Sequence, residues 1–204
     1  MIRAAAPGTG PRAGSSPAHG TSLVEVLTVL ALISCGLGAG LPAMSHGVDA
    51  RRTEDAAAFL AGQFRLARQR AVMSGQSVAV VFDDVAGEVG WRVCRDHDRD
   101  GVSRSDITAG VDRCDSAPRT LADQFAHVRV GYAPGVPHLD GESTSSPLRF
   151  GVARMAVFSP SGTSSSGSIV VRGAGSTQSA VRVSGVTGRT RVLRFDPGRK
   201  SWVE

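Results

Sequence analysis

The sequence predicts an α+β fold, in which a long N-terminal helix packs on a C-terminal antiparallel β-sheet domain. Three observations favour this class. Residues 23–43 are almost entirely apolar, apolar residues from 56 to 71 recur at spacings of three and four, and from residue 78 onward they recur at every second position. A helical pattern followed by strand patterns is typical of α+β proteins.

The composition bounds the size of the core. The 204-residue chain is 41% hydrophobic but only 5% aromatic. Without a leader and an anchor, roughly 130–160 residues remain, which is enough for one small domain. We therefore expect a modest core built mainly of Val, Leu and Ala.

Residues 1–20 have the character of a leader peptide. They are rich in Ala, Gly, Pro and Ser, and they carry Arg3 and Arg12 but no acidic residue. An ordinary secretory signal is cleaved at a small-residue site after its apolar run. Residues 39–44 match such a cleavage site only poorly. Positive charge on the leader side directs the N-terminus toward the cytoplasm.

Residues 21–44 are predicted to form a transmembrane and assembly helix. From Leu23 to Ala43 the only ionisable groups are Glu25 and the thiol of Cys35. About twenty such residues suffice for one membrane-spanning helix. A carboxylate near the start of such a helix costs roughly 2.5–3.5 kcal/mol on insertion scales. Glu25 is therefore either solvated at the headgroup boundary or retained for a function.

The order of residues around this start resembles the processing site of type IV pilins and type II secretion pseudopilins: Gly20, a small polar pair, Leu-Val, Glu25 and then the apolar run. The resemblance implies that a prepilin peptidase cleaves between Gly20 and Thr21 and that Thr21 is then N-methylated. It also implies that Glu25 pairs with the terminal amine of a neighbouring subunit in a fibre. The family usually has Phe where this chain has Thr21. Pro42 matches a helix-kinking Pro found in many pilins.

Residues 45–75 are predicted to be the amphipathic second half of the same helix. Charged residues occupy the faces away from the apolar one, and Ser74-Gly75 is a stop signal. The expected apolar face consists of Ala56, Leu60, Phe64, Ala67 and Ala71, with Phe59 beside them.

Residues 76–204 are predicted to form a globular, β-rich domain. Alternating patterns over 78–82 and 91–93 indicate a hairpin, with Asp83, Asp84 and Gly87 as its turn. Further strands are expected at 128–132, 155–158, 168–172, 180–184 and 190–195, with Gly/Ser/Pro clusters between them.

Three later stretches resemble the GspH/FimT branch of minor pseudopilins and pilins. Residues 67–76 look like its "AR-x-x-A" end of the helix, residues 158–162 like its "F-x-P-x-G" turn, and residues 184–192 like its closing strand pair. The resemblance implies a pilin-like fold, an anchor in the inner membrane and a periplasmic C-terminal domain. The implied partners are other pseudopilins or pilins, the prepilin peptidase and the inner-membrane assembly platform.

The remaining two cysteines bracket an acidic loop. Cys94 and Cys114 can pair in an oxidising compartment, although the sequence does not show how close they lie. A bridge closing a loop of this length would stabilise the fold by about 3 kcal/mol in the chain-entropy model. We predict that the bridge forms in the exported protein.

Within that loop, Asp96, Asp98 and Asp100 precede Gly101 in the opening pattern of an EF-hand calcium loop. The twelfth position is Ile107 instead of the Glu that closes such a site, and no helix signal precedes the loop. Asx turns in an acidic hairpin explain the same residues. We expect no metal and no other cofactor.

The basic charge is concentrated at the C-terminal end. From Val171 onward seven basic residues oppose two acidic ones, which equals the whole net charge of +5. On paired strands Arg182, Arg189 and Arg191 can share one face, and clustered arginines suit phosphate contacts. The Gly-Arg-x-Arg stretch is associated with DNA uptake in the FimT-like branch. A solvated strand face is the competing explanation, because the interleaved aromatics of nucleic-acid platforms are nearly absent.

No catalytic motif is found in the chain. The five His residues show no H-E-x-x-H spacing, and no Ser lies in a G-x-S-x-G elbow. The leading interpretation is a GspH-like minor pseudopilin, a structural subunit of a type II secretion system and not an enzyme. The alternative is a FimT-like minor type IV pilin that binds DNA for uptake through its basic C-terminal sheet.

Overall fold

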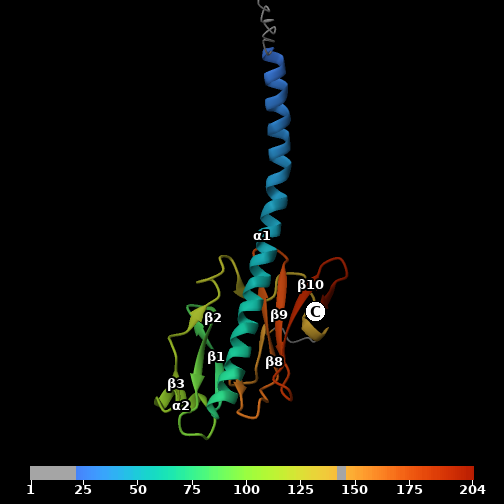
Figure 1. Cartoon of the computed structure of the whole chain (residues 1–204). Helices are drawn as coiled ribbons and strands as arrows, with labels where there is room; N and C mark the ends of the chain where they lie inside the picture. Colours follow the sequence, from blue (N-terminus) through green and yellow to red (C-terminus); the bar gives the residue numbers. More distant parts are fainter. Residues whose placement is uncertain (1–21, 142–145) are drawn as a thin grey trace, which may run out of the picture. The chain divides into compact units, whose positions relative to one another are not determined.

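The computed structural model describes residues 22–141 and 146–204, with side chains for all of them except residues 36–46 and 140. The chain forms two compact units, residues 1–42 and residues 43–204, and each is described by itself. Helix α1 (Leu23–Ser74) begins in the first unit and ends in the second (Figure 1).

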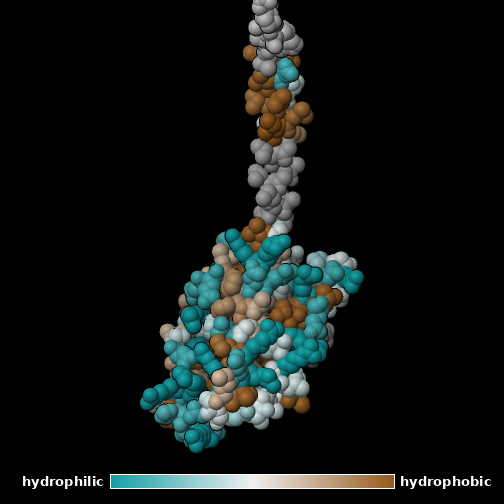
Figure 2. Space-filling view, viewed as in Figure 1, coloured by the Kyte–Doolittle hydropathy of each residue, from teal (hydrophilic) through white to brown (hydrophobic). Residues whose placement is uncertain are grey.

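In the first unit, every described side chain from Leu23 to Cys35 is exposed. Most of these side chains are hydrophobic, as Figure 2 shows, and Leu23 and Leu32 are 75% and 74% exposed. None of the helical stretches among the described residues has the length and hydrophobicity needed to span a bilayer. The span predicted over 21–44 includes residues 36–44, whose side chains lie outside the described part, and it stays a prediction.

In the second unit, α1 buries the face that its periodicity predicts. The side chains at 56, 60, 64, 67 and 71 are all at most 1% exposed. The helix ends at Ser74 because Gly75 adopts a left-handed conformation with φ of 65°, which glycine accepts without a steric penalty. The Gly75 N–H donates to the carbonyl of Ala71 at 3.1 Å.

One side of α1 is covered by a five-stranded antiparallel sheet in the order β3-β2-β1-β7, with β4 also paired to β2. Its strands are β1 (Val78–Val85), β2 (Glu88–Arg95), β3 (Arg113–Cys114), β4 (Arg119–Thr120) and β7 (Met155–Phe158). Figure 1 shows β1 and β2 to the left of the helix. The short helix α2 (Arg104–Ala109) follows β2 in the chain, and the 3-10 turn η1 (Leu139–Gly141) contributes Leu139 to a cluster on the six-stranded sheet described below.

The turn between β1 and β2 differs from the prediction. It consists of Ala86 and Gly87, which have φ of 52° and 82°, and Val85 pairs with Glu88. Two left-handed residues form a type I′ turn, whose twist matches that of the flanking strands. Asp83 and Asp84 therefore lie inside β1, although the Asp84 carboxylate still accepts a hydrogen bond from the Gly87 N–H at 3.1 Å.

A six-stranded antiparallel sheet covers the other side of α1, in the order β11-β10-β9-β8-β5, with β6 paired to β8 (Figure 1). Its strands are β5 (Arg129–Val130), β6 (Leu148–Arg149), β8 (Gly167–Arg172), β9 (Gln178–Val183), β10 (Thr190–Asp196) and β11 (Ser201–Val203). The strand predicted at 128–132 is shorter than expected, because only Arg129 and Val130 pair with β8.

The core between α1 and the two sheets is built mainly of Val, Leu and Ala, as predicted, and it also contains a cluster of phenylalanines. Phe64 of α1 lies 6.2 Å, 5.6 Å and 6.3 Å from the rings of Phe82, Phe150 and Phe158, measured between centroids. Phe59 forms a second aromatic group with Trp91 and Phe125, with ring centroids 5.7 Å apart in each pair.

The six-stranded sheet has a second, partly covered face. Leu139, Val170 and Ala180 form a separate buried cluster there, with Tyr132 and Trp202 packed against it. The segment around Leu139 thus covers one end of this face.

Candidate functional site

The residues predicted for processing and assembly fall only partly within the described chain. Gly20 and Thr21 lie outside it, and Pro42 lies within α1 but its side chain is not described. Glu25 is in the first turn of α1. Its exposed carboxylate makes no ion pair with any described residue, and an acidic group is favoured at this end of a helix by the helix dipole.

The three stretches that resemble the GspH/FimT branch meet at Arg68. The Arg68 Nε–H donates to the carbonyl of Gly162 at 2.9 Å. Gly188 packs against both groups: a Cβ there would lie 2.5 Å from the Gly162 carbonyl oxygen and 2.6 Å from Arg68 Nε. Gly188 also has φ of 60°, so only glycine fits this position without strain.

A groove lined by arginines lies between α1 and the start of β10. Arg65 and Arg68 of the helix and Arg189 and Arg191 of the sheet line this hollow of about 490 Å³. Among its lining residues Glu204 is the only acidic one. Its carboxylate lies 3.3 Å from Arg191 Nη1, and both side chains are about half exposed, so the pair contributes little to stability. We call this hollow the arginine groove.

The face of the six-stranded sheet that points away from α1 carries a row of basic residues. Strand register places Arg191 opposite Arg182, Arg182 opposite Ser168, and Ser168 opposite Arg149. Directly opposed residues share a face, and the alternate positions of these strands belong to the core under α1. Arg149, Arg182 and Arg191 therefore form one row across β6, β9 and β10.

The structure brings together the three arginines proposed from the sequence. Arg182, Arg189 and Arg191 line a second hollow, of about 330 Å³, with Ser184 and Thr187. Sequence reasoning missed Arg65, Arg68 and Arg149. They are far from the C-terminal stretch in sequence, and only the "AR-x-x-A" pattern around Arg68 marked any of them.

The acidic loop uses two of its carboxylates to hold its own backbone. Asp96 accepts hydrogen bonds from the N–H groups of Arg99 and Gly101 at 2.7 Å and 3.1 Å. Asp112 accepts from His97 and Ser103 at 3.2 Å and 3.0 Å. This is the Asx-turn alternative of the sequence interpretation.

The three aspartates of the calcium pattern do not all converge. Ligand atoms of Asp96, Asp98 and Asp112 lie within 4.8 Å of one another. The third carboxylate of this group is therefore Asp112 and not Asp100, which the sequence pattern predicted. Asp100 is exposed, and its hydrogen bond to Asp98, together with the negative charge of Asp98, raises the pKa of the Asp100 carboxyl. Sequence spacing could not indicate Asp112, because the loop folds back before reaching it.

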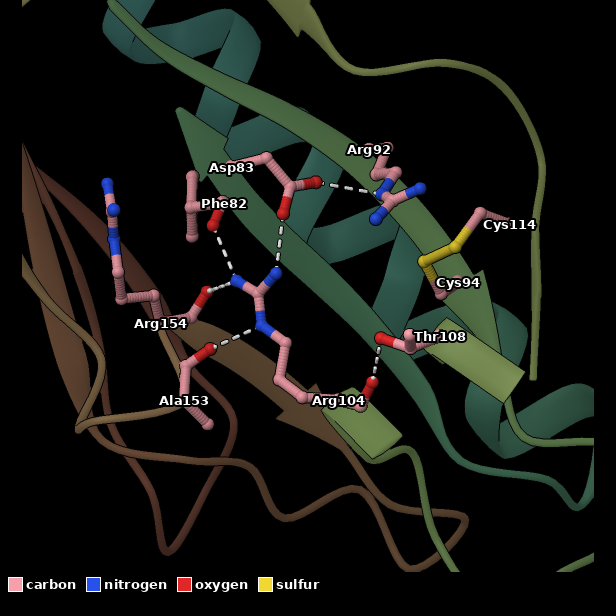
Figure 3. A network of polar contacts seen from close by, with 9 residues as sticks. All are labelled: Phe82, Asp83, Arg92, Cys94, Arg104, Thr108, Cys114, Ala153 and Arg154. Carbon is pink, nitrogen blue, oxygen red and sulfur yellow. Dashed lines mark hydrogen bonds and ion pairs between the residues drawn. A yellow bond between two sulfur atoms is a disulfide. The ribbon is translucent and has the colours of Figure 1, made fainter. Parts of the chain in front are cut away.

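A disulfide and an arginine clamp attach this loop to the first sheet (Figure 3). Cys94 and Cys114 are directly opposed on β2 and β3 and are joined by an S–S bond of 1.98 Å. Arg104 donates from Nε to the carbonyl of Ala153 at 2.9 Å, and its other nitrogens contact the Asp83 carboxylate and the Phe82 carbonyl. Asp83 is therefore part of a structural ion-pair network.

One comparison with known proteins finds a match. The family model described as type II transport protein GspH matches residues 56–188. Neither the curated proteins nor the solved structures contain a match to the chain. The matched segment begins on the buried face of α1 and ends at Gly188. It therefore contains Arg68, Gly162 and Gly188, the three residues that contact one another.

Proposed function

The chain belongs to the family of type II transport protein GspH, and from this premise we propose that it is a minor pseudopilin of a type II secretion system. Its role is structural: it is a subunit of a short periplasmic pseudopilus that supports protein secretion. The observation that carries this proposal is the extent of the family match, over residues 56–188. The match spans the buried helix face, the five-stranded sheet, strands β5, β6, β8 and β9 of the six-stranded sheet, and the three contacting residues Arg68, Gly162 and Gly188.

We propose that the first unit supplies the anchor. Residues 1–20 are removed by a prepilin peptidase, Thr21 becomes the methylated terminus, and residues 21–44 insert into the inner membrane with the C-terminal domain in the periplasm. The exposure of every described side chain from Leu23 to Cys35 supports this, because uncovered apolar side chains favour apolar surroundings. A disulfide between Cys94 and Cys114 suits an oxidising compartment.

The proposed partners are other pseudopilins of the same fibre, with the inner-membrane assembly platform at its base. Glu25 is the proposed assembly residue, since its carboxylate is exposed in the first turn of α1. A structural subunit needs no catalytic site, and we assign no enzymatic activity.

The identity of the fibre partners tests this proposal. The affinity-tagged chain is expressed in its own host, crosslinked in intact cells and purified, and the crosslinked proteins are identified by mass spectrometry. We expect the major pseudopilin of the secretion system. Recovery of a major pilin of a retractable pilus would favour the alternative, and recovery of neither would overturn both.

The alternative function, DNA binding by a FimT-like minor pilin, is favoured by one specific observation. Arg182, Arg189 and Arg191 line a common hollow, and Arg65 and Arg68 line the adjoining groove with the last two of them. Such a cluster of guanidinium groups can contact several phosphates at once.

A further inference from the structure

We propose that the open edge of β10, beside the arginine groove, binds an extended acidic segment of a partner protein by strand addition. In this mode the segment pairs with the backbone of β10 and extends the six-stranded sheet, and its carboxylates contact the arginines of the groove. This binding is independent of the fibre role and concerns only the surface of the second unit.

Among the described residues, the N-terminal half of β10 has no strand neighbour on its outer edge. Ser184 N–H donates to the carbonyl of Arg189 at 2.9 Å, so these residues form a hydrogen-bonded pair at the end of the β9–β10 ladder. Bonded and non-bonded pairs alternate along an antiparallel ladder. The N–H and C=O groups of Thr190 and Val192 therefore point away from β9, toward the opposite edge. On that edge β11 pairs only from Arg194 onward.

Within the described residues, no strand thus covers the outward backbone groups of Thr190 and Val192. An uncovered edge of this kind is a template for an added strand. The main-chain hydrogen bonds provide affinity in such complexes, and alternate side chains provide specificity.

The side chains around this edge indicate an acidic ligand. Arg65 and Arg68 lie on the α1 side of the groove, and Arg189 and Arg191 come from the β10 side. Side chains of an added strand point alternately to its two faces. A strand with several carboxylates can therefore contact arginines on both of its faces. Among the residues that line the groove, the only acidic side chain that it would have to displace is Glu204, which is about half exposed and paired only with the exposed Arg191.

A peptide fits these features better than a nucleic acid does. Outward N–H and C=O groups two residues apart match the repeat of a peptide strand. None of the residues that line the groove is aromatic, whereas proteins that bind single strands usually stack bases on aromatic rings.

Binding is tested with the full chain in a zwitterionic detergent and a fluorescein-labelled octapeptide of alternating Glu and Thr. The comparison peptide has the same sequence and charge but is N-methylated at its four central residues, which blocks backbone pairing on both of its edges. We expect the N-methylated peptide to bind at least tenfold more weakly in fluorescence anisotropy. Equal binding of the two peptides would show a site for any polyanion and would overturn strand addition.

Two protein variants locate the site. Val192→Pro removes the outward N–H without removing a bond to β9, and Val192→Ala is its matched control. Arg65→Glu reverses a charge in the groove, and Arg199→Glu makes the same change outside it. We expect Val192→Pro and Arg65→Glu each to weaken peptide binding at least tenfold, and the two controls to change it less than threefold.

A 12-base-pair DNA duplex is the competitor. If it displaces the peptide and binds the Val192→Pro variant as well as the wild type, the groove is a phosphate site and the proposal fails. Absence of peptide binding to the wild type also overturns it. If Val192→Pro does not fold, the two peptides on the wild-type chain still decide the question.

Discussion

Arg68 and Gly188 lie in direct contact, although 120 residues separate them in the chain. A Cβ at Gly188 would lie only 2.6 Å from Arg68 Nε, the atom that donates to the carbonyl of Gly162. This contact joins the C-terminal part of α1 to two turns, and both Arg68 and Gly188 line the arginine groove together with Arg189 and Arg191.

Gly188→Ala should therefore destabilise the chain. The left-handed conformation and the close approach to a backbone carbonyl should together cost about 2–4 kcal/mol. Urea unfolding followed by circular dichroism measures the loss. Gly175→Ala is the control, because its Cβ would meet no atom within 4 Å; an equal effect of the two substitutions would contradict the packing argument.

The exported protein should contain the Cys94–Cys114 bridge. Mass spectrometry of non-reduced peptides should show the linked pair, and Cys94→Ser with Cys114→Ser should lower the free energy of unfolding by about 3 kcal/mol. Cys35→Ser should leave it unchanged. Two free thiols in the exported protein would refute the bridge, and a melting temperature that falls on addition of a chelator would reopen the calcium interpretation.

Glu25→Ala should leave the protein in the membrane fraction but prevent its recovery in the crosslinked fibre. The reason is that only the pairing with a neighbouring subunit is removed, and the change makes residues 21–44 more hydrophobic. Asp55→Ala, an exposed acid further along α1, is the matched control. Normal fibre recovery of the Glu25 variant would exclude the assembly role.

If the DNA alternative holds, the chain should bind duplex DNA without sequence preference and with a steep salt dependence. Three to four phosphate contacts at a slope of roughly −0.9 each imply a loss of about two orders of magnitude in affinity between about 20 and 100 mM salt. Arg189→Ala with Arg191→Ala should remove most of the binding with little change in melting temperature, because exposed arginines contribute little to stability.

Fluorescence anisotropy of wild type and double variant at the two salt concentrations measures this. Arg199→Ala with Lys200→Ala removes the same charge outside the groove and should have a smaller effect. No binding at low salt, or unchanged binding of the Arg189/Arg191 variant, would leave the basic strand as a solvated face.

Local patterns in the sequence were sufficient for the helix and the longer strands. The buried positions of α1 from 56 to 71 follow from the 3.6-residue period, and its end follows from Gly75, because both depend on neighbours within one or two turns. The strand predicted at 155–158 coincides with β7. Two-residue strands such as β3 and β6 show no period of their own and were not predicted.

The sequence alone predicts the α+β class and the order of the longer elements, and its motifs indicate the family. The ion-pair network of Asp83, the place of Asp112 in the acidic loop and the groove that Arg65 and Arg68 line with Arg189 and Arg191 are seen only in the folded chain. The physical reason is that secondary structure depends on contacts between near neighbours in the chain, whereas a site is formed by residues that only the packing of α1 against the two sheets brings together.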